Sequence, residues 1–407
     1  MIDWPDMNRG WRMWVASAVI MLCSWLSYVD RQVLAVLSPM ILRDTGLSVQ
    51  AYADAVSAFS FAYMIANPLW GSILDRIGLR IGMLLAVGLW TIASVSHAWV
   101  NGFIGFALAR SVLGFGEGAT FPGGLRTSRD SLPPDRQSRG MAIAYSGSTL
   151  GAIVTPLIVV PFALAFGWRA AFFLTGGLGA AWLGVWWMAA RPPWLHPTKR
   201  TPKMVLPSVL ERRFWALVVG MGVGGAPLGI ILTLSPVYLN RALHMTQAEL
   251  GKILWMPTLG WGLGYYFWGW IADRYVGEDQ RPARLYLLLG GLTLPLALVT
   301  ASGSTPLVLA LFFWGMFIAV GFITLSLHVA ARAYPQDQTG MVAGIGSGAW
   351  GAVLALVLLV YGRWFDRQWY AATFISAALV PVLGTALWLW LTVSAPAREP
   401  AMARSAR

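Results

Sequence analysis

The feature that most constrains the fold is a series of apolar stretches, each about 20 residues long, that recur along the whole chain. A helix of that length crosses a hydrocarbon core of ~30 Å, whereas the strands of a membrane β-barrel alternate over ~10 residues. Only 11% of the 407 residues are charged, against about 25% in an ordinary soluble domain. The sequence therefore predicts an all-α polytopic membrane protein.

Twelve spans are predicted, and the longest interruption divides them into two sets of six. That interruption, residues 191–213, is rich in proline and basic residues, which is typical of a linker. It separates an N-terminal six-helix bundle at 1–190 from a C-terminal six-helix bundle at 214–407, which ends in a short tail. The predicted spans are residues 12–41, 51–74, 79–98, 101–125, 140–165, 168–190, 214–240, 247–271, 284–302, 305–331, 340–362 and 369–393.

Basic residues predict the orientation of the spans. With both termini on one side, that side holds 21 Lys and Arg residues and the opposite loops hold 6. Because short cytoplasmic loops carry the excess of basic residues, both termini are predicted to be cytoplasmic. This asymmetry explains the net charge of +12 without a nucleic-acid partner. The single cysteine, Cys23, lies in the first span and excludes an intramolecular disulfide.

The two halves of the chain resemble each other in sequence. WGSILDR (70–76), at the end of the second span, matches WGWIADR (268–274), at the end of the eighth, at five of seven positions. GMAIAYSGSTLGA (140–152) and GMVAGIGSGAWGA (340–352) begin the fifth and eleventh spans. Both pairs keep the same side of the membrane, so the repeat is parallel. Two parallel six-helix halves are the design of the major facilitator transporters, with the substrate site between them at the midplane.

Four charged residues lie inside predicted spans: Asp30, Arg31, Arg110 and Glu117. Each costs about 2.5–3.5 kcal/mol at a helix centre on insertion scales, so such residues pair with one another or line a substrate route. Arg110 and Glu117 are two helical turns apart and share one face. Asp30 and Arg31 lie about 100° apart around their helix and need not bond to each other. A buried structural network that ties the first span to the fourth is the alternative, and it is compatible with function.

The residue types suggest separate roles. Arginine stays charged when desolvated and presents a planar fork that matches a carboxylate, so Arg31 is a candidate for binding an anionic substrate. Burial disfavours a charged carboxyl, which favours gain and loss of a proton. Asp30 and Glu117 are the acids well inside spans and are the candidates for proton coupling. Sodium coupling would require several more oxygen ligands.

The first half contains five ordered motifs that carry a family resemblance. They are YVDRQVLAVLSP, AFSFAYMIANPLWGSILDRIGLRIG, ARSVLGFGEGATFPGGLR, AIAYSGSTLGAIVTPLIV and FGWRAAFFLTGGLGAAWLGVW, within residues 24–190. Together they resemble the anion:cation symporter family of major facilitators, and within it the hexuronate transporter-like branch. In the second half the resemblance rests mainly on topology and on WGWIADR.

This resemblance implies proton-coupled uptake of a hexuronate or other sugar acid by alternating access, in a monomer of the bacterial inner membrane, surrounded by lipid. It implies no cofactor and no metal, with the proton as coupling ion. The substrate-binding residues that it implies are Tyr28, Arg31 and Tyr63, with Ser146 and Ser148 where the family has a polar amide or similar side chain. Asp30 and Glu117 would carry protons, and Arg110 would belong to their network.

The loop GSILDRIGLR (71–80) fits a motif found across major facilitators. Gly71 would let two helices approach closely, and Asp75 would pair with a neighbouring helix end in the outward-open state. The remaining gating residues that this motif and its repeat imply are Arg76, Gly78, Arg80, Asp273 and Arg274. An ordinary charged turn that follows the distribution of basic residues is the alternative.

The sequence gives little support for functions other than transport. The sequence has no nucleophile, metal cluster or nucleotide loop that would indicate an enzyme, and no added domain that would indicate a sensor. An aromatic or dicarboxylic acid remains an alternative substrate. A drug efflux pump for cations is less favoured because Arg31 would repel them. For Trp261, packing against lipid is favoured over a position facing the cavity. For His328, a satisfied structural role is favoured over contact with substrate or acceptance of a proton.

Overall fold

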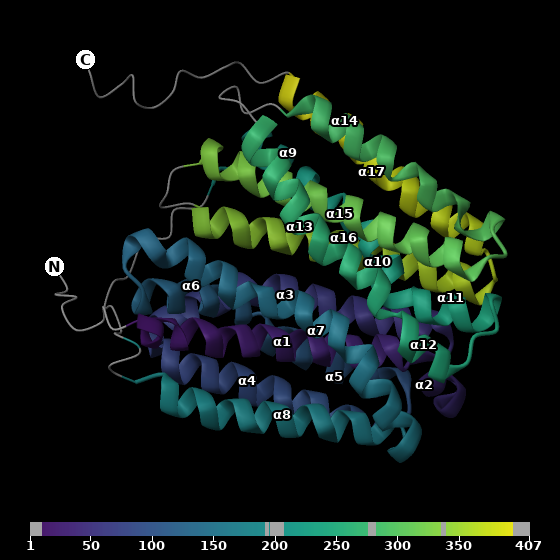
Figure 1. Cartoon of the computed structure of the whole chain (residues 1–407), viewed down its shortest axis with the longest axis horizontal. Coiled ribbons are helices and arrows are strands. Elements are labelled where there is room, and N and C mark those ends of the chain that lie inside the picture. Colours follow the sequence, from purple (N-terminus) through teal and green to yellow (C-terminus); the bar gives the residue numbers. More distant parts are fainter. Residues whose placement is uncertain (1–9, 192–194, 196–206, 276–281, 335–338, 394–407) are drawn as a thin grey trace.

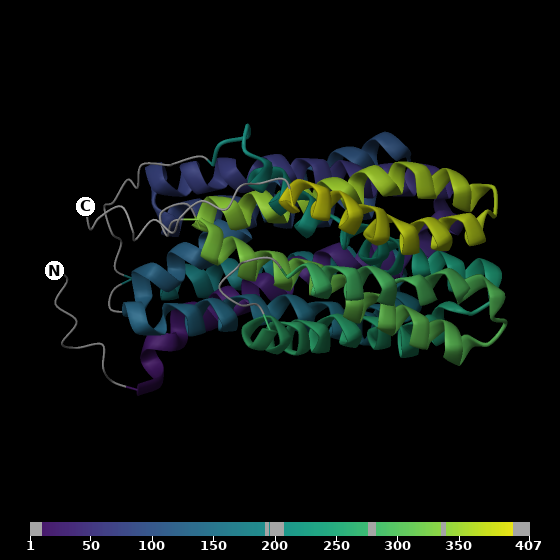
Figure 2. The same cartoon turned by 90° about the horizontal axis from the view of Figure 1, so that it is seen from above.

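The computed structural model describes residues 10–191, 195, 207–275, 282–334 and 339–393. Long helices lie side by side along the longest axis of the molecule (Figure 1), and the view turned by 90° shows the same lengthwise arrangement (Figure 2). The first elements of the chain are η1 (Gly10–Trp14), α1 (Val15–Val36), α2 (Ser38–Thr45), α3 (Val49–Ile77), α4 (Leu79–Ser96), η2 (His97–Trp99), α5 (Phe103–Glu117), α6 (Thr120–Ser131), η3 (Pro134–Arg136), α7 (Gln137–Phe166) and α8 (Trp168–Ala189).

The second half continues the same helical pattern. It comprises α9 (Arg212–Gly222), α10 (Gly225–Gly229), the π-helix η4 (Ile230–Leu234), α11 (Ser235–Ala242), α12 (Gln247–Ile253), α13 (Trp255–Tyr275), α14 (Ala283–Leu292), η5 (Leu294–Ala301), α15 (Thr305–Ala333), α16 (Thr339–Asp366) and α17 (Tyr370–Val393). We call the elements through α8 the N half and those from α9 the C half. The predicted linker lies mostly outside the described residues, and the proposed bundle boundaries stay predictions.

Nine helices in the described part of the chain are long and apolar enough to cross a membrane. The expected all-α membrane fold is confirmed, but the count of twelve spans is not confirmed in full. The other three predicted spans coincide with α3, with α5 and α6, and with α12 and α13. They are less apolar or interrupted, and two of them carry polar groups of the site described below.

Local sequence explains where several helices begin and end. The Ser48 hydroxyl caps α3 by accepting a hydrogen bond from the N–H of Ala51 at 3.0 Å. Gly78 ends α3 with a φ of +84°, which a residue with a side chain rarely adopts, and α4 starts at the next residue. Thr246 and Glu249 form a reciprocal capping box at the start of α12. These signals place the turns between successive spans.

Helix packing brings the two halves together along two seams. In the N half, α1 packs on α7 and α8, and α3 packs on α5. In the C half, α13 packs on α15, and α9 packs on α16 and α17. Across the halves, α3 packs on α16 and α7 packs on α13. The start of α1 and the end of α17 lie at one end of the bundle, at the left in Figure 1. We call it the terminal end and the opposite one the far end.

Hydrogen bonds join the halves near the far end. The Tyr52 hydroxyl donates to the carbonyl of Thr233 at 3.0 Å, and the Ser57 hydroxyl to that of Ala355 at 3.0 Å. Further bonds run from Gln50 to the Leu359 carbonyl and from Gln247 to the Val36 carbonyl. The close contacts of α3 with α16 extend from Gly362 at the far end to Gly348 beside Met64, near the middle of α3. The halves are therefore closed at the far end.

The Asp366 carboxylate brings a charged group into this closure. It is the last residue of α16, and its two oxygens accept the N–H groups of Val49 and Gln50, both at 2.9 Å. Those N–H groups belong to the first turn of α3, where the helix dipole favours a negative charge. Arg241 lies 3.8 Å from the same carboxylate. An acid of the C half thus caps a helix of the N half.

Replacing Asp366 by Ala is expected to loosen the far end. The loss of a helix-capping charge is worth about 1 kcal/mol, which changes the ratio of closed to open molecules about fivefold. Spin labels at positions 166 and 304, on opposite halves at the far end, would report a longer mean distance. Asp44→Ala is the matched control, because Asp44 binds Arg169 within the N half at 2.6 Å. An unchanged distance distribution in Asp366→Ala would contradict the capping role.

Candidate functional site

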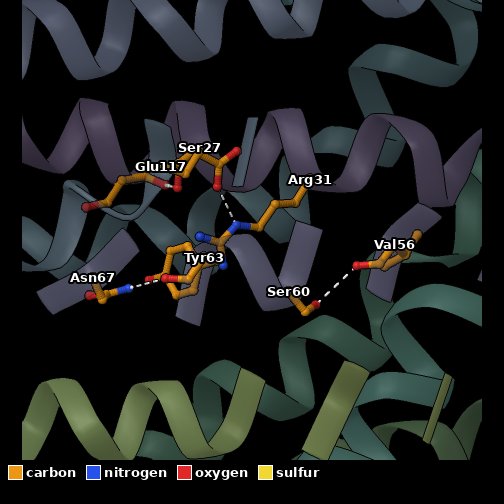
Figure 3. Close-up of polar contacts among 8 residues, drawn as sticks. Ser27, Arg31, Val56, Ser60, Tyr63, Asn67 and Glu117 are labelled. Atoms are coloured by element: carbon orange, nitrogen blue, oxygen red, sulfur yellow. Dashed lines mark hydrogen bonds and ion pairs between the residues drawn. The ribbon is translucent and has the colours of Figure 1, made fainter. Parts of the chain in front are cut away.

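Arg31 lies at the centre of the candidate site. Its guanidinium carbon is 4.8 Å from the ring centre of Tyr28, 5.0 Å from that of Phe59 and 4.5 Å from that of Tyr63. Its Nε donates to Glu117 Oε2 at 2.5 Å, across α1 and α5 (Figure 3). The two terminal guanidinium nitrogens make no hydrogen bond with any described residue. Arg31 is therefore oriented by Glu117 and retains two terminal nitrogens, each with two N–H groups, as donors for a ligand.

Glu117 reaches Arg31 because α5 approaches α3 very closely. A Cβ on Gly114 would lie 2.3 Å from the Phe59 carbonyl oxygen, and one on Gly118 would lie 2.6 Å from the Ala66 Cβ. Small residues four apart let two membrane helices come into backbone contact. The Glu117 side chain is fully buried, and its second carboxyl oxygen has no partner. The GFGEG stretch thus places an acid with a free oxygen beside Arg31.

Arg110 lies two turns before Glu117, on the same face of α5, as the spacing predicts. It is buried, and its guanidinium carbon is 6.0 Å from the ring centre of Phe59. Two of its nitrogens, Nε and one terminal nitrogen, are buried without a hydrogen-bond partner. A buried arginine with unpartnered N–H groups can donate to a new acceptor at little cost in free energy, because the guanidinium has already lost its hydration.

Asp30 points away from Arg31, which confirms that these neighbours do not bond to each other. Its Oδ1 accepts a hydrogen bond from the Ser94 hydroxyl at 2.7 Å, and Ser94 contacts the Thr175 hydroxyl at 2.9 Å. These partners come from α4 and α8, so Asp30 lies inside the N half, only 2% exposed. It does not face the space beside Arg31. Ser94 and Thr175 are partners that sequence reasoning missed.

The C half contributes aromatic rings to the same site. The Trp261 ring of α13 lies 5.2 Å from the Tyr28 ring, and Tyr265, one turn further on, lies 6.1 Å from Trp261. Trp261 is 3% exposed. The prediction that it packs against lipid is therefore wrong: contact between the halves buries it at the midpoint of its span. Its spacing within the helix carries no signal for that contact.

The remaining predicted substrate residues fare differently. Tyr63 is beside Arg31, as expected (Figure 3). The Ser146 hydroxyl donates to the carbonyl of Ile143 at 2.8 Å, within its own helix. Ser148 follows Gly147, which backs directly onto α1 at Met21. Neither serine is hydrogen-bonded to Arg31 among the described residues, and their role in substrate binding stays a prediction.

The loop motif at 71–80 makes contacts within the N half. Asp75 pairs with Arg126 of α6 at 2.7 Å. Arg80 stacks on the Trp187 ring at 3.9 Å and donates to its carbonyl at 3.3 Å, which holds α4 to α8. Arg76 is exposed. A Cβ on Gly71 would meet nothing within 4 Å, so the expected close helix approach at that glycine is absent from this conformation.

The repeated motif in the C half has a different partner. Asp273 of α13 lies 3.4 Å from His328 Nδ1 of α15 and is 80% exposed at its side chain. Arg274 lies 5.8 Å from the ring centre of Trp270. His328 Nδ1 therefore contacts a second helix at the terminal end, whereas its Nε2 is buried without a hydrogen-bond partner among the described residues, and its role stays a prediction. The gating roles of Asp273 and Arg274 stay predictions.

Chemically, the site can hold an anion beside a protonatable acid. No group of three His, Cys, Asp or Glu residues that could hold a metal ion occurs in the part of the chain that the structure describes. What the site offers instead is one arginine with free donors, one buried acid with a free oxygen, and rings from both halves. These features suit a site that binds an anion between the two halves.

Comparison with known proteins agrees with this geometry. A model of the Major Facilitator Superfamily matches residues 20–358. The chain therefore belongs to the Major Facilitator Superfamily and is an integral membrane transporter, not an enzyme.

Among its relatives, the hexuronate transporter of Escherichia coli K12 is 25% identical, over 95% of this chain and 96% of that protein. The D-galactonate transporter of Escherichia coli O6:H1 is 24% identical, over 94% of this chain and 96% of that protein. The galacturonate transporter of Dickeya chrysanthemi is 25% identical, over 63% of this chain and 81% of that protein.

A solved structure also shares the fold. A bacterial homologue of the human lysosomal transporter Spinster, in an inward-facing and occupied conformation, superposes with a TM-score of 0.76. It is 14% identical and covers 94% of this chain and 98% of its own. At that identity the likeness concerns the fold alone, which is the all-α major facilitator fold expected from the sequence.

Replacing Gly114 by Ala is expected to destabilise the N half. The added Cβ would meet the backbone of α3, and overpacking of this kind costs about 1–3 kcal/mol. The measurement is the unfolding temperature of the purified protein in detergent. Gly88→Ala in α4 is the matched control, because a Cβ there meets nothing within 4 Å. Equal unfolding temperatures for the two variants would contradict the close contact of α5 with α3.

Proposed function

We propose that this transporter takes up a hexuronate or other sugar acid together with protons, by alternating access. The observation that carries the proposal is the Arg31–Glu117 ion pair, 2.5 Å long, in which Arg31 retains two free terminal nitrogens. The names of the relatives support a sugar acid as the substrate. The ion pair supports proton coupling because protonation of Glu117 would release Arg31 for the substrate.

A substrate carboxylate and Glu117 would compete for the same guanidinium. Two carboxylates beside one arginine leave a net negative charge in a buried site, and an uncompensated buried charge costs about 3–5 kcal/mol. A proton on Glu117 removes that cost, because the neutral acid releases Arg31 and can still donate a hydrogen bond. Binding of the anion and of the proton would then favour each other, which is the thermodynamic basis of symport.

Asp30 and Arg110 would form the second part of the proton network. Asp30 is held by Ser94 inside the N half, and Arg110 has unpartnered nitrogens on the face of α5 that also carries Glu117. On this proposal, Arg110 would balance the charge of Asp30 inside the N half. The charge of Glu117 is then balanced by Arg31 alone.

The distribution of basic residues supports a direction for this conformation. With 21 basic residues on the side of the termini and 6 on the other, the terminal end would be cytoplasmic. The closed far end would then face the outside of the inner membrane, so this conformation would release substrate inward. The protein would do this as a monomer, since each half supplies one wall of the site.

An aromatic acid is the second candidate substrate. Four rings, those of Tyr28, Phe59, Tyr63 and Trp261, surround Arg31 or lie next to it. Such rings can stack on an aromatic ligand. They can also pack against the apolar face of a sugar ring. Competition between glucuronate and benzoate for binding to the same purified protein separates the two candidates.

Replacing Arg31 by Ala is expected to weaken glucuronate binding about 10- to 100-fold, the range for loss of hydrogen bonds to a charged group. Arg31→Lys should also be impaired, because an ammonium cannot reproduce the bidentate fork. Titration calorimetry on the purified protein measures both. Arg31→Ala leaves Glu117 unpaired, so the double variant with Glu117→Gln serves as the control for that secondary effect. Affinity close to wild type in both alanine variants would contradict the role of Arg31.

Replacing Glu117 by Gln is expected to preserve exchange of substrate across the membrane and to abolish accumulation driven by a pH gradient. The glutamine is a permanent mimic of the protonated acid, so it frees Arg31 at every pH but moves no proton. Liposomes loaded with a pH-sensitive dye measure proton entry on addition of glucuronate or galacturonate. Proton-driven accumulation that survives in Glu117→Gln would show that coupling does not require this acid.

A further inference from the structure

Gln32, the residue after Arg31, is buried between the halves with its amide unused. The residue is only 7% exposed. Its amide makes no hydrogen bond with any residue that the structure describes. The amide nitrogen and oxygen keep a small solvent-accessible surface. Gln32 is part of the lining of a small cavity. A buried amide without a partner costs about 1–3 kcal/mol unless water or a ligand satisfies it.

The cavity lies on the seam between the two halves. Its volume is about 10 Å³, which is room for about one water molecule. The N half supplies Gln32 and the end of α1 together with part of α7, and the C half supplies parts of η4, α11 and α13. Thr258 of this lining is one helical turn before Trp261, whose ring contacts Tyr28. The cavity is therefore next to the aromatic rings of the site.

Three prolines bear on the polarity of the lining, which is apolar in its larger part. Pro156, Pro236 and Pro257 all line the cavity. A proline has no N–H, so it cannot bind the carbonyl four residues earlier in its helix. Two of the residues that lose this donor, Ala152 and Leu232, also line the cavity.

Two hydroxyl groups add to this polarity. Ser235 and Thr258 donate to carbonyls of their own helices at 2.5 and 2.7 Å, which leaves their oxygen lone pairs as acceptors. The C half thus supplies two hydroxyl acceptors to the cavity, and the N half supplies the Gln32 amide, which can donate and accept. A π-helical turn such as η4 is frequent at functional sites.

We propose that Gln32 and this cavity bind one hydroxyl group of the substrate whose carboxylate is bound by Arg31. A hydroxyl has the size of the water that the cavity can hold, and like water it both donates and accepts. Gln32 lies one turn after Tyr28 on the same face of α1, and the Tyr28 ring centre is 4.8 Å from the Arg31 guanidinium carbon, so a compact ligand with a carboxylate and a hydroxyl would reach both. The substrate class is therefore a hydroxylated carboxylate. This inference rests on the proposed function and narrows its substrate.

The cavity also explains how an aromatic acid would be disfavoured. A ligand without hydroxyls that displaced the water would leave the Gln32 amide buried and unpaired. Sites built to bind a hydroxyl reject analogues that lack it far more strongly than apolar pockets reject a change of size. Because the lining comes from both halves, a hydroxyl bound there also contacts the two parts that move in alternating access.

The test compares two anions that share a six-membered ring and a carboxylate: glucuronate and cyclohexanecarboxylate, which has no hydroxyl. Dissociation constants are measured by titration calorimetry on wild type and Gln32→Ala. We expect Gln32→Ala to weaken glucuronate binding about 3- to 10-fold, the effect of one neutral hydrogen bond, and to leave cyclohexanecarboxylate unchanged. Gln137→Ala is the matched control, because its amide donates to the Leu132 carbonyl at 3.2 Å, at the terminal end.

Four outcomes would overturn the inference. Equal weakening for both anions would mean that Gln32 only positions Arg31. No change for either would mean that Gln32 holds a structural water. A lowered unfolding temperature with unchanged discrimination in Gln32→Leu, which keeps the side-chain volume, would mean a packing role. If folded wild type binds neither anion, the proposed function fails as well, so failure of the inference alone is recognised by wild-type binding of glucuronate.

Discussion

Two opposite charges, Arg31 and Glu117, meet inside an apolar bundle, where leaving either one alone would cost about 3–5 kcal/mol. Much of the surrounding structure serves to keep them together. Gly114 brings α5 against the backbone of α3, which sets Glu117 at the level of Arg31. Three aromatic rings then lie within 5.0 Å of the guanidinium carbon and supply the electron-rich surfaces that a desolvated cation prefers. The pair is stable only while both partners keep their charge, so its protonation state and its structure are linked.

The geometry of α1 distributes three polar residues over three different neighbours. Successive residues on a helix are about 100° apart. Asp30 consequently contacts Ser94 of α4, and Arg31 contacts Glu117 of α5. Gln32 faces the seam with the C half. Within one helical turn, α1 therefore carries the buried acid Asp30, the ion-paired Arg31, and Gln32 at the surface along which the halves meet. A small rotation or shift of this helix would alter all three contacts together.

The sequence predicts the fold more completely than the site. Apolar runs of span length and the 198-residue repeat predict a membrane bundle, and the position of Glu117 two turns after Arg110 places both on one face. Whether Arg31 would pair with Asp30 or Glu117 could not be read from spacing, because the partners lie on separate helices. The sequence predicts the wrong surroundings for Trp261 for the same reason, since contact with Tyr28 of the other half decides what covers it. Gly71 shows the converse: the close helix contact that its motif predicts is absent from this conformation.

The free energy of the hydrogen bonds that close the far end is comparable to the cost of breaking the Arg31–Glu117 ion pair. The bonds that join the halves run largely to backbone atoms, as with Tyr52, Ser57, Gln247 and Asp366. Each of these five bonds, two of them to Asp366, contributes about 0.5–1.5 kcal/mol net, so the set amounts to roughly 2.5–7.5 kcal/mol. An unpaired charge at Glu117 costs about as much. A change of charge at one buried acid is therefore large enough to shift the balance between open and closed far ends. A much stronger closure would hold the transporter in one state whatever the site contained.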